Sequence, residues 1–337
     1  MKLRVGLLGL SDVWHQRHAP ALRMLADRYD VRAVCDQVTH RAQQAALEFS
    51  AATVDGFRAL TRREDLDAIL ILAPQWFGAL PILAACDSGK AVYCAAGLDL
   101  SLEEAEQVKE RVEEAGIAFM AEFPRRYAPA TLRLKELIAT RLGAPKLLFC
   151  HQRSVADLPS LQCASRWPRP TGVRHLVELV DWCRYVVDRP ASWVTGIMHP
   201  ATSMPNEADY QWMSLDFSDA DTPGSGTIAQ ISCGRYIPPT WQEAITYRPL
   251  AGLQVSCERG IAFVDLPSTL IWFDEAGRHQ ESLDSERPVG EQLLTQFHRA
   301  VTSLLRKTND LEDTYRALLI VQQARISQTE GRRFRLE

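Results

Sequence analysis

The chain has 337 residues, more than one hydrophobic core usually accommodates, so we expect two domains. Its 46% hydrophobic and 24% charged residues are typical of soluble globular proteins, and its net charge of -4 argues against a nucleic-acid partner, which would require a basic face. We interpret Arg125-Arg126 and Arg332-Arg333 as solvated surface charge. No apolar run approaches the roughly 18 residues of a membrane helix, and the first residues lack a secretion-signal pattern. We therefore expect a cytoplasmic protein without a membrane partner.

The eight cysteines are scattered along the chain and form no C-x-x-C pair. This spacing indicates neither a zinc site nor a redox dithiol, and we predict no metal site. We interpret the cysteines as small buried side chains in a reducing compartment.

The first 122 residues alternate between apolar, strand-like segments and helix-like segments. Strands are predicted at 3–9, 31–36, 68–73, 91–94 and 117–121, and helices at 15–29, 40–49, 81–88 and 101–115. The last helix begins with a capping box, in which Ser101 is followed three residues later by Glu104. Near-continuously apolar strands separated by helices are typical of a parallel sheet covered on both faces. The pattern predicts an α/β fold with a Rossmann-type dinucleotide-binding domain over 1–122, and ligands at the carboxyl ends of its strands.

Residues 123–337 are predicted to form a second domain, of the α+β class. Strands are expected at 146–150, 192–197, 211–217, 226–232, 253–256, 261–264 and 269–273, and helices at 173–187, 290–305 and 311–328. Turn residues between many of these strands favour an open, mostly antiparallel sheet. The C-terminal helix is a candidate for packing back on the first domain.

The loop after the first strand resembles a dinucleotide fingerprint only in part. The fingerprint is G-x-G-x-x-G, and here Gly9 is followed by Ser11 and Trp14 at the other two glycine positions. The Ser11 hydroxyl could hydrogen-bond a phosphate, whereas Trp14 departs more from the small residue that lets helix and strand pack closely. Asp36 ends the second strand, where a carboxylate binds the ribose 2′-hydroxyl and repels a 2′-phosphate. The alternative is an acid that only caps a turn.

A series of short stretches extends along nearly the whole chain. They are 17–22 (Arg-His-Ala-Pro-Ala-Leu), 73–75, 84–90, 100–105, 123–127 (Phe-Pro-Arg-Arg-Tyr), 258–265, 297–301, 311–317 and 327–333. In this order and spacing they resemble the Gfo/Idh/MocA family of nicotinamide-dependent sugar and polyol oxidoreductases. The resemblance implies NAD as cofactor, a sugar or polyol as substrate, and a homo-oligomer (dimer or tetramer) formed through the exposed face of the second domain's sheet.

The resemblance also implies which residues line the cofactor cleft. Trp76 and Phe77 directly follow the stretch 73–75, and they could form a wall of the nicotinamide pocket or pack in a core. The candidate cofactor-binding residues are Gly9, Ser11, Asp12, Val13, Asp36, Ala73, Pro74, Gln75 and Ala95.

Three positions depart from the family's catalytic pattern. After the fourth strand the family usually has E-K-P, whose lysine lies near the substrate and assists proton transfer, and Ala96 stands in its place. In the second domain the family often places an Asp and a His four residues apart on a helix, ahead of D-x-x-R-W. Alignment on Asp181 puts Arg174 and Glu178 at those two positions.

These departures affect proton transfer, to which a positioned acid or base contributes roughly 10²–10⁴-fold. Alanine cannot ionise, and arginine ionises too far above neutrality to act as a base. Candidate replacements are His175, Glu178 and Tyr127; the alternatives are a surface ion pair between Arg174 and Glu178 and a merely hydrogen-bonded His175. We predict an NAD-dependent dehydrogenase or reductase with replaced proton-transfer residues. The alternative is a non-catalytic or cofactor-free member that acts as a dinucleotide- or sugar-binding sensor or partner subunit.

Overall fold

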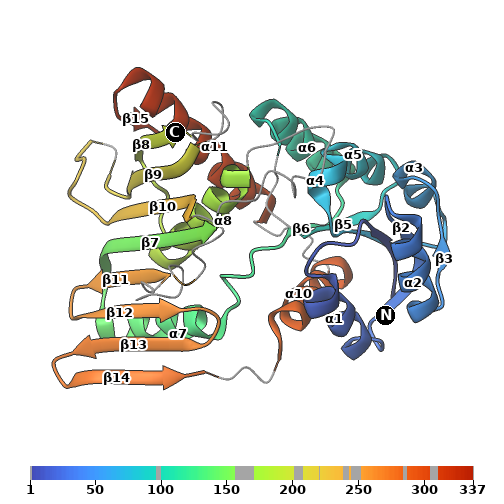
Figure 1. Cartoon of the computed structure of the whole chain (residues 1–337), viewed down its shortest axis with the longest axis horizontal. Helices are drawn as coiled ribbons and strands as arrows, with labels where there is room; N and C mark the ends of the chain where they lie inside the picture. Colours follow the sequence, from blue (N-terminus) through green and yellow to red (C-terminus); the bar gives the residue numbers. More distant parts are fainter. Residues whose placement is uncertain are drawn as a thin grey trace. The chain divides into compact units, whose positions relative to one another are not determined.

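The structure, a computed structural model, describes residues 2–95, 100–155, 171–200, 208–219, 221–237, 243, 252–283, 287–303 and 310–336. The chain divides into two compact units (Figure 1). The first comprises Met1–Pro124 with Glu286–Leu318, and the second comprises Arg125–Ser285 with Leu319–Glu337. Within the described ranges, no helix combines the length and the apolar character needed to cross a membrane.

The first unit contains a six-stranded, wholly parallel sheet in the order β3-β2-β1-β4-β5-β6. All residues of β4 and β5 are buried, as expected of strands covered on both faces. The strand order reverses between β1 and β4, and sheets of this kind bind ligands at the carboxyl ends of the strands beside that point. The predicted Rossmann-type sheet is confirmed. Its strands are β1 (Leu3–Leu8), β2 (Tyr29–Cys35), β3 (Ala52–Thr53), β4 (Ala68–Ile71), β5 (Ala91–Cys94) and β6 (Phe119–Ala121).

The helices of the first unit include one from far along the chain. They are a π-helical turn η1 (Trp14–His18), α1 (Ala19–Met24), α2 (Thr39–Phe49), α3 (Phe57–Thr61), α4 (Pro74–Phe77), α5 (Leu80–Asp87), α6 (Leu102–Ala115) and α10 (Val289–Thr302). The capping box of α6 is confirmed, since Ser101 Oγ accepts from Glu104 N at 3.2 Å and Glu104 Oε2 accepts from Ser101 N at 2.9 Å. The Tyr29 hydroxyl donates to the Leu294 carbonyl at 2.6 Å and so ties α10 to the start of β2.

The first predicted helix was too long. Helical residues end at Met24, because Tyr29 already belongs to β2 and pairs with Leu3 in the sheet. The short elements β3, α3 and α4 were not predicted, since runs of two to five residues show no hydrophobic period.

The second unit contains a nine-stranded mixed sheet in the order β14-β13-β12-β11-β7-β10-β9-β8-β15. Only β7 and β10 pair in parallel, so the prediction of a mostly antiparallel sheet is confirmed. The strands are β7 (Pro145–Val155), β8 (Trp193–Pro200), β9 (Ala208–Asp216), β10 (Ile228–Ile237), β11 (Leu253–Cys257), β12 (Gly260–Asp265), β13 (Thr269–Asp274), β14 (Gly277–Ser282) and β15 (Phe334–Arg335).

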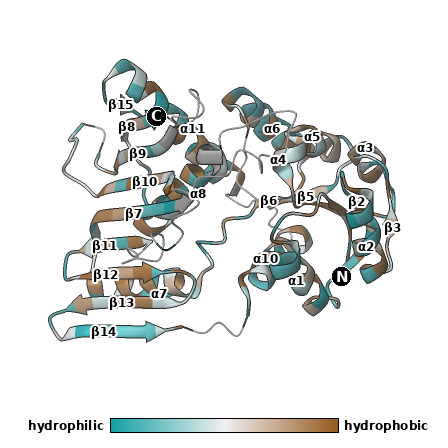
Figure 2. Cartoon of the chain, in the orientation of Figure 1, coloured by the Kyte–Doolittle hydropathy of each residue, from teal (hydrophilic) through white to brown (hydrophobic). Residues whose placement is uncertain are grey.

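Helices cover one face of this sheet. α7 (Pro129–Leu137) continues into the π-helical turn η2 (Ile138–Leu142) and contacts β12 and β13, whereas α8 (Thr171–Val187) contacts β7, β9 and β10. The last helix, α11 (Asp310–Glu330), begins in the first unit and ends in the second. The edge strand β14 is hydrophilic throughout (teal in Figure 2), which explains why no strand was predicted there.

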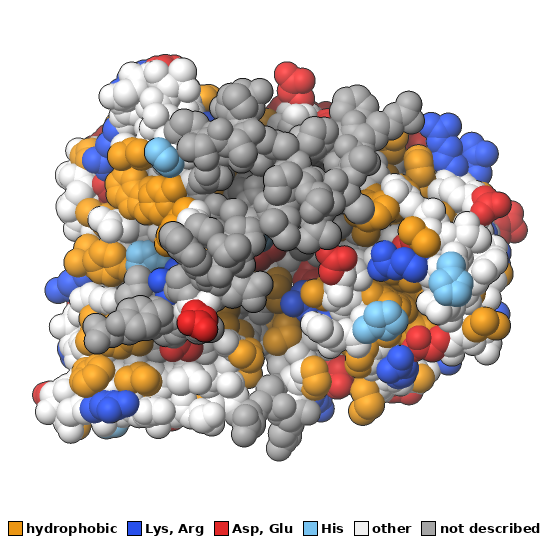
Figure 3. Space-filling view, viewed as in Figure 1, with side chains coloured by type: hydrophobic (Ala, Val, Ile, Leu, Met, Phe, Trp, Pro, Cys, Tyr) orange, Lys and Arg blue, Asp and Glu red, His pale blue; other side chains and the backbone are white. Residues whose placement is uncertain are grey.

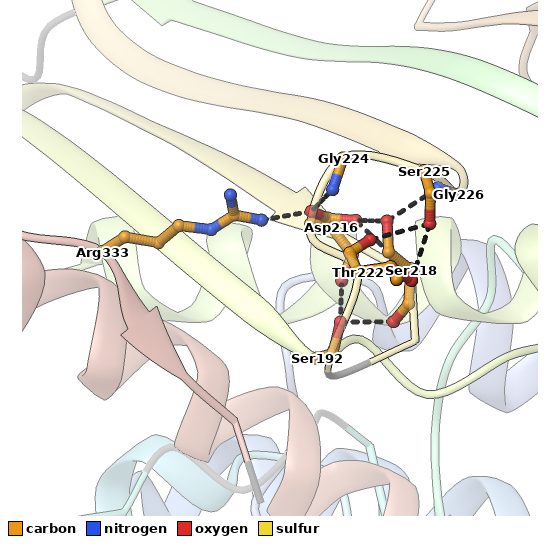
Figure 4. A network of polar contacts seen from close by, with 8 residues as sticks. All are labelled: Ser192, Asp216, Ser218, Thr222, Gly224, Ser225, Gly226 and Arg333. Atoms are coloured by element: carbon orange, nitrogen blue, oxygen red, sulfur yellow. Dashed lines mark hydrogen bonds and ion pairs between the residues drawn. The ribbon is translucent and has the colours of Figure 1, made fainter.

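The loop between β9 and β10 closes around Asp216, the last residue of β9 (Figure 4). Its carboxylate accepts hydrogen bonds from Ser218 N at 2.8 Å, from Gly224 N at 2.7 Å, from the Ser218 hydroxyl and from the Arg333 guanidinium. Burial would raise the pKa of Asp216, but these donors outweigh it and lower that pKa. Arg333, interpreted as solvated surface charge, is 39% exposed, and it also pairs with the buried carboxylate of Asp216 just before β15.

Candidate functional site

The structure places Gly9 directly after β1 with a φ of +68°, a backbone conformation that favours glycine. A Cβ on Gly9 would lie 2.8 Å from the Cβ of Ala73 and 3.2 Å from Cε2 of Phe77. Ala73 follows β4, so the two predicted residues meet at the point where the strand order reverses. Only a glycine fits this approach without displacing its neighbours.

The residues from Ser11 to Val13 lead into the helical turn that begins at Trp14. Trp14 N donates to the Ser11 carbonyl at 3.0 Å. The backbone N–H groups of Ser11, Asp12 and Val13 meet no hydrogen-bond acceptor within the part of the chain that the structure describes. Successive unpaired N–H groups ahead of a helix can donate hydrogen bonds to a bound anion. The loop therefore fits the pyrophosphate of a dinucleotide.

Trp14, at the position of the third fingerprint glycine, is a core residue. Its side chain is buried and makes an edge contact with Phe49 of α2, with ring centroids 5.9 Å apart. Its indole consequently does not occupy the solvent side of the loop.

The remaining predicted cofactor residues lie at strand ends of the same sheet. Pro74 is in the first turn of α4, and Ala95 is buried and donates from N to the Ile71 carbonyl at 2.9 Å. Trp76 is 41% exposed, whereas Phe77 lies against Gly9. The side chain of Gln75 lies outside the described residues.

Asp36 follows β2, and both of its oxygens are hydrogen-bonded. Oδ2 accepts from Leu10 N at 2.6 Å, and Oδ1 accepts from Val38 N at 2.8 Å. Asp36 therefore caps the turn. Its carboxylate oxygens can still accept a further hydrogen bond from a ribose hydroxyl. The guanidinium of Arg41, five residues further on, donates to the carbonyls of Leu10 and Ser11.

The predicted proton-transfer candidates belong to the second unit. His175 and Glu178 lie on α8, one turn apart, and both are half-buried, as is Tyr127 ahead of α7. The structure does not describe Ala96 or the side chain of Arg174, so their predicted positions stay predictions.

Arg125 links Glu178 to the sheet. Its Nε lies 3.9 Å from Glu178 Oε2, its Nη2 donates to Gln152 Oε1 of β7 at 2.8 Å, and its guanidinium lies 5.3 Å from the ring of Trp182. Glu178 therefore has an ionic partner other than Arg174.

The interpretation of Arg125-Arg126 as solvated surface charge is wrong. Both side chains are mostly buried and face residues of α8 or β7. The sequence carried no signal of this, because the buried Asp181 that pairs with Arg126 is 55 residues away.

A buried carboxylate that the sequence did not point to lies in the first unit. Glu122 follows β6 and accepts from the Arg17 guanidinium, from His18 Nε2 at 3.0 Å and from the Tyr93 hydroxyl at 3.1 Å. Burial would raise the pKa of Glu122, but hydrogen bonds and positive charge from His18 and Arg17 outweigh it and lower that pKa. The sequence did not link Arg17 or His18 to Glu122, because neither lies near Glu122 along the chain. Both belong to the stretch 17–22, which was named only for its resemblance to the family.

Comparison with known proteins identifies the family of the first unit. Residues 3–123 match the Gfo/Idh/MocA model, described as an oxidoreductase family with an NAD-binding Rossmann fold. The chain is 33% identical to D-xylose 1-dehydrogenase (NADP(+)) 2 of Haloferax volcanii over 41% of this chain and 42% of that protein. It is 27% identical to inositol 2-dehydrogenase 3 of Saccharopolyspora erythraea over 54% of each chain. The matches thus span about half the length of these relatives.

Solved structures extend the likeness of fold to both units. An aldose-aldose oxidoreductase from Caulobacter crescentus complexed with glycerol superposes with a TM-score of 0.84, at 14% identity and over 100% of both chains. Levoglucosan dehydrogenase in complex with NADH and levoglucosan superposes with a TM-score of 0.83, at 15% identity and over 99% of both chains. The first unit therefore matches the NAD-binding Rossmann domain of the Gfo/Idh/MocA oxidoreductases, and the chain shares the fold of these two solved structures.

Proposed function

We propose that the chain is an NAD-dependent oxidoreductase that acts on a sugar, a polyol or a related hydroxy compound. The observation that supports it most directly is the phosphate loop, where Gly9 approaches Ala73 and three successive N–H groups meet no acceptor among the described residues. The named activities of the relatives, on xylose and on inositol, indicate the substrate class. When bound, the nicotinamide supplies or accepts a hydride.

The chain itself must supply the proton, and the family lysine is replaced by Ala96. Of the three candidates, His175 is the first choice, because an imidazole ionises near neutrality. Glu178 is engaged by Arg125, which favours a role in holding that arginine in place. Tyr127 is the third candidate.

Titration of the protein with NADH, followed by fluorescence, tests the cofactor site. Gly9→Ala should weaken NADH binding at least about tenfold, because the added methyl would collide with Ala73. Gly89→Ala is the matched control: Gly89 also has a positive φ, of +62°, but a Cβ there meets nothing within 4 Å. This control should lose stability only through its strained backbone, and it should bind NADH normally.

Two outcomes would contradict the proposal. If Gly9→Ala binds NADH as the wild type does, the loop is not the pyrophosphate site. If the wild type does not bind NADH at millimolar concentration, the cofactor-free alternative holds instead. With binding established, aldoses, inositols and anhydrosugars can be screened for NADH production.

We also propose that the chain forms a homo-oligomer through the open face of the nine-stranded sheet. Hydrophobic side chains gather over the strands of the second unit (Figure 3). Four of them, on β7, β8, β10 and β13, are 40–54% exposed: Leu147, Ile197, Tyr236 and Phe273. Each alternates along its strand with buried residues of the opposite face, and a face this apolar is typical of a protein interface.

The test is the mass in solution, measured by light scattering. Ile197→Glu combined with Tyr236→Glu should reduce the mass to that of a smaller assembly. Leu47→Glu, at an 82% exposed position on α2, is the control and should leave the mass unchanged. A wild-type monomer would refute the proposal.

A further inference from the structure

Ser11 in the phosphate loop is connected to a fully buried carboxylate. Its Oγ lies 3.4 Å from His18 Nδ1, and the opposite ring nitrogen, Nε2, lies 3.0 Å from Glu122 Oε2. The side chains of His18 and Glu122 are each only 1% exposed. Imidazole thus bridges the loop and the end of β6 within the first unit.

The partners of Glu122 fix the orientation of the imidazole. Glu122 also accepts from Arg17 and Tyr93, so its carboxylate is held from three sides. As an acceptor, the carboxylate requires a proton on Nε2. A neutral ring then accepts the Ser11 O–H at Nδ1, and a protonated ring donates to Ser11 Oγ. In either state the Ser11 side chain is held toward His18.

We propose that His18, oriented by Glu122, holds the Ser11 hydroxyl away from the cofactor side and so lets Ser11 serve in place of the second fingerprint glycine. That glycine allows the backbone to approach the pyrophosphate. A serine free to rotate would place its hydroxyl beside the N–H groups of Asp12 and Val13. His18 is therefore a positioning residue, and the Ser11 hydroxyl is not the phosphate ligand that the sequence suggested. This inference rests on the proposed NAD site.

Two substitutions at His18 separate its two contacts. In His18→Gln the amide lies near the place of Nε2, so the contact with Glu122 is kept and that with Ser11 is lost. In His18→Asn the amide lies near the place of Nδ1, so the reverse holds. We expect His18→Gln to weaken NADH binding about three- to tenfold with a melting temperature near that of the wild type. We expect His18→Asn to bind NADH nearly normally and to melt at a lower temperature.

The decisive comparison repeats the His18→Gln substitution in a protein that also contains Ser11→Gly. Because a glycine has no side chain to hold, His18→Gln should no longer change the NADH dissociation constant in the Ser11→Gly protein. Equal weakening in both backgrounds, or weakening that follows the loss of melting temperature in both His18 variants, would overturn the inference. A wild type that does not bind NADH would instead overturn the proposed function, so the two failures are distinguishable.

Discussion

Arg126 donates hydrogen bonds from Nε and Nη2 to the two carboxylate oxygens of Asp181, whose side chain is only 1% exposed. The pair joins the segment ahead of α7 to α8, the helix that contains His175 and Glu178. Removing one partner of a buried ion pair leaves the other charge without compensation.

We therefore expect Asp181→Asn to lower the free energy of unfolding by about 3 kcal/mol, measured by urea denaturation. Glu136→Gln, which breaks an exposed pair with Arg133, is the control and should cost under about 0.5 kcal/mol. Similar losses in the two variants would show that the Arg126–Asp181 pair stabilises the fold no more than an exposed ion pair does.

The choice between NAD and NADP should depend on the charge of Asp36. Asp36→Asn removes the charge that repels a 2′-phosphate but keeps an acceptor for the N–H of Leu10 or Val38. Arg41, in the first turn of α2, donates to the Leu10 carbonyl and can then attract the phosphate. We expect the ratio of NADPH to NADH affinity to rise about tenfold or more. An unchanged ratio in parallel titrations would exclude the ribose role of Asp36.

The proposed replacement of the family lysine by Ala96 predicts slow turnover of polyols by the wild type. Ala96→Lys, with Arg174→Asp and Glu178→His added, should raise kcat by roughly 10–100-fold, within the range that a positioned acid or base contributes. Ala96→Met, of similar length but uncharged, is the control and should give no gain. If the wild type already turns over a polyol at ordinary rates, the proton-transfer group is present, and His175 and Tyr127 are the first residues to substitute.

Acid should remove the stabilising contribution of Asp216. Because the pKa of Asp216 is lower in the folded protein, its ionised carboxylate stabilises the fold above the ordinary pKa of about 4, and this stability is lost as pH falls through the folded-state pKa. Asp216→Asn should cost about 1–3 kcal/mol at pH 7, and the difference from the wild type should shrink below pH of about 4. Urea denaturation at several pH values measures this. Asp219→Asn, at an exposed neighbour, should show no such trend.

Local sequence patterns determined the secondary structure and the class of fold. Five apolar runs separated by helices predicted β1, β2, β4, β5 and β6. Strand-like runs separated by turn residues after residue 145 predicted most of the second sheet. Such patterns suffice because the period of apolar residues shows which face of a helix or strand is buried. The position of Gly9 at the end of β1 was predictable for the same reason.

Only the tertiary structure decided which charged and polar side chains meet. Arg17 and Glu122 are 105 residues apart, and Arg126 and Asp181 are 55 apart, yet each pair is in contact. Tertiary packing also assigned α10 to the first unit, although it follows most of the second in sequence. A buried charge must find a partner, but its sequence neighbourhood does not say which, because the partner is set by how distant elements pack. For the same reason the sequence did not reveal that the Ser11 side chain contacts His18.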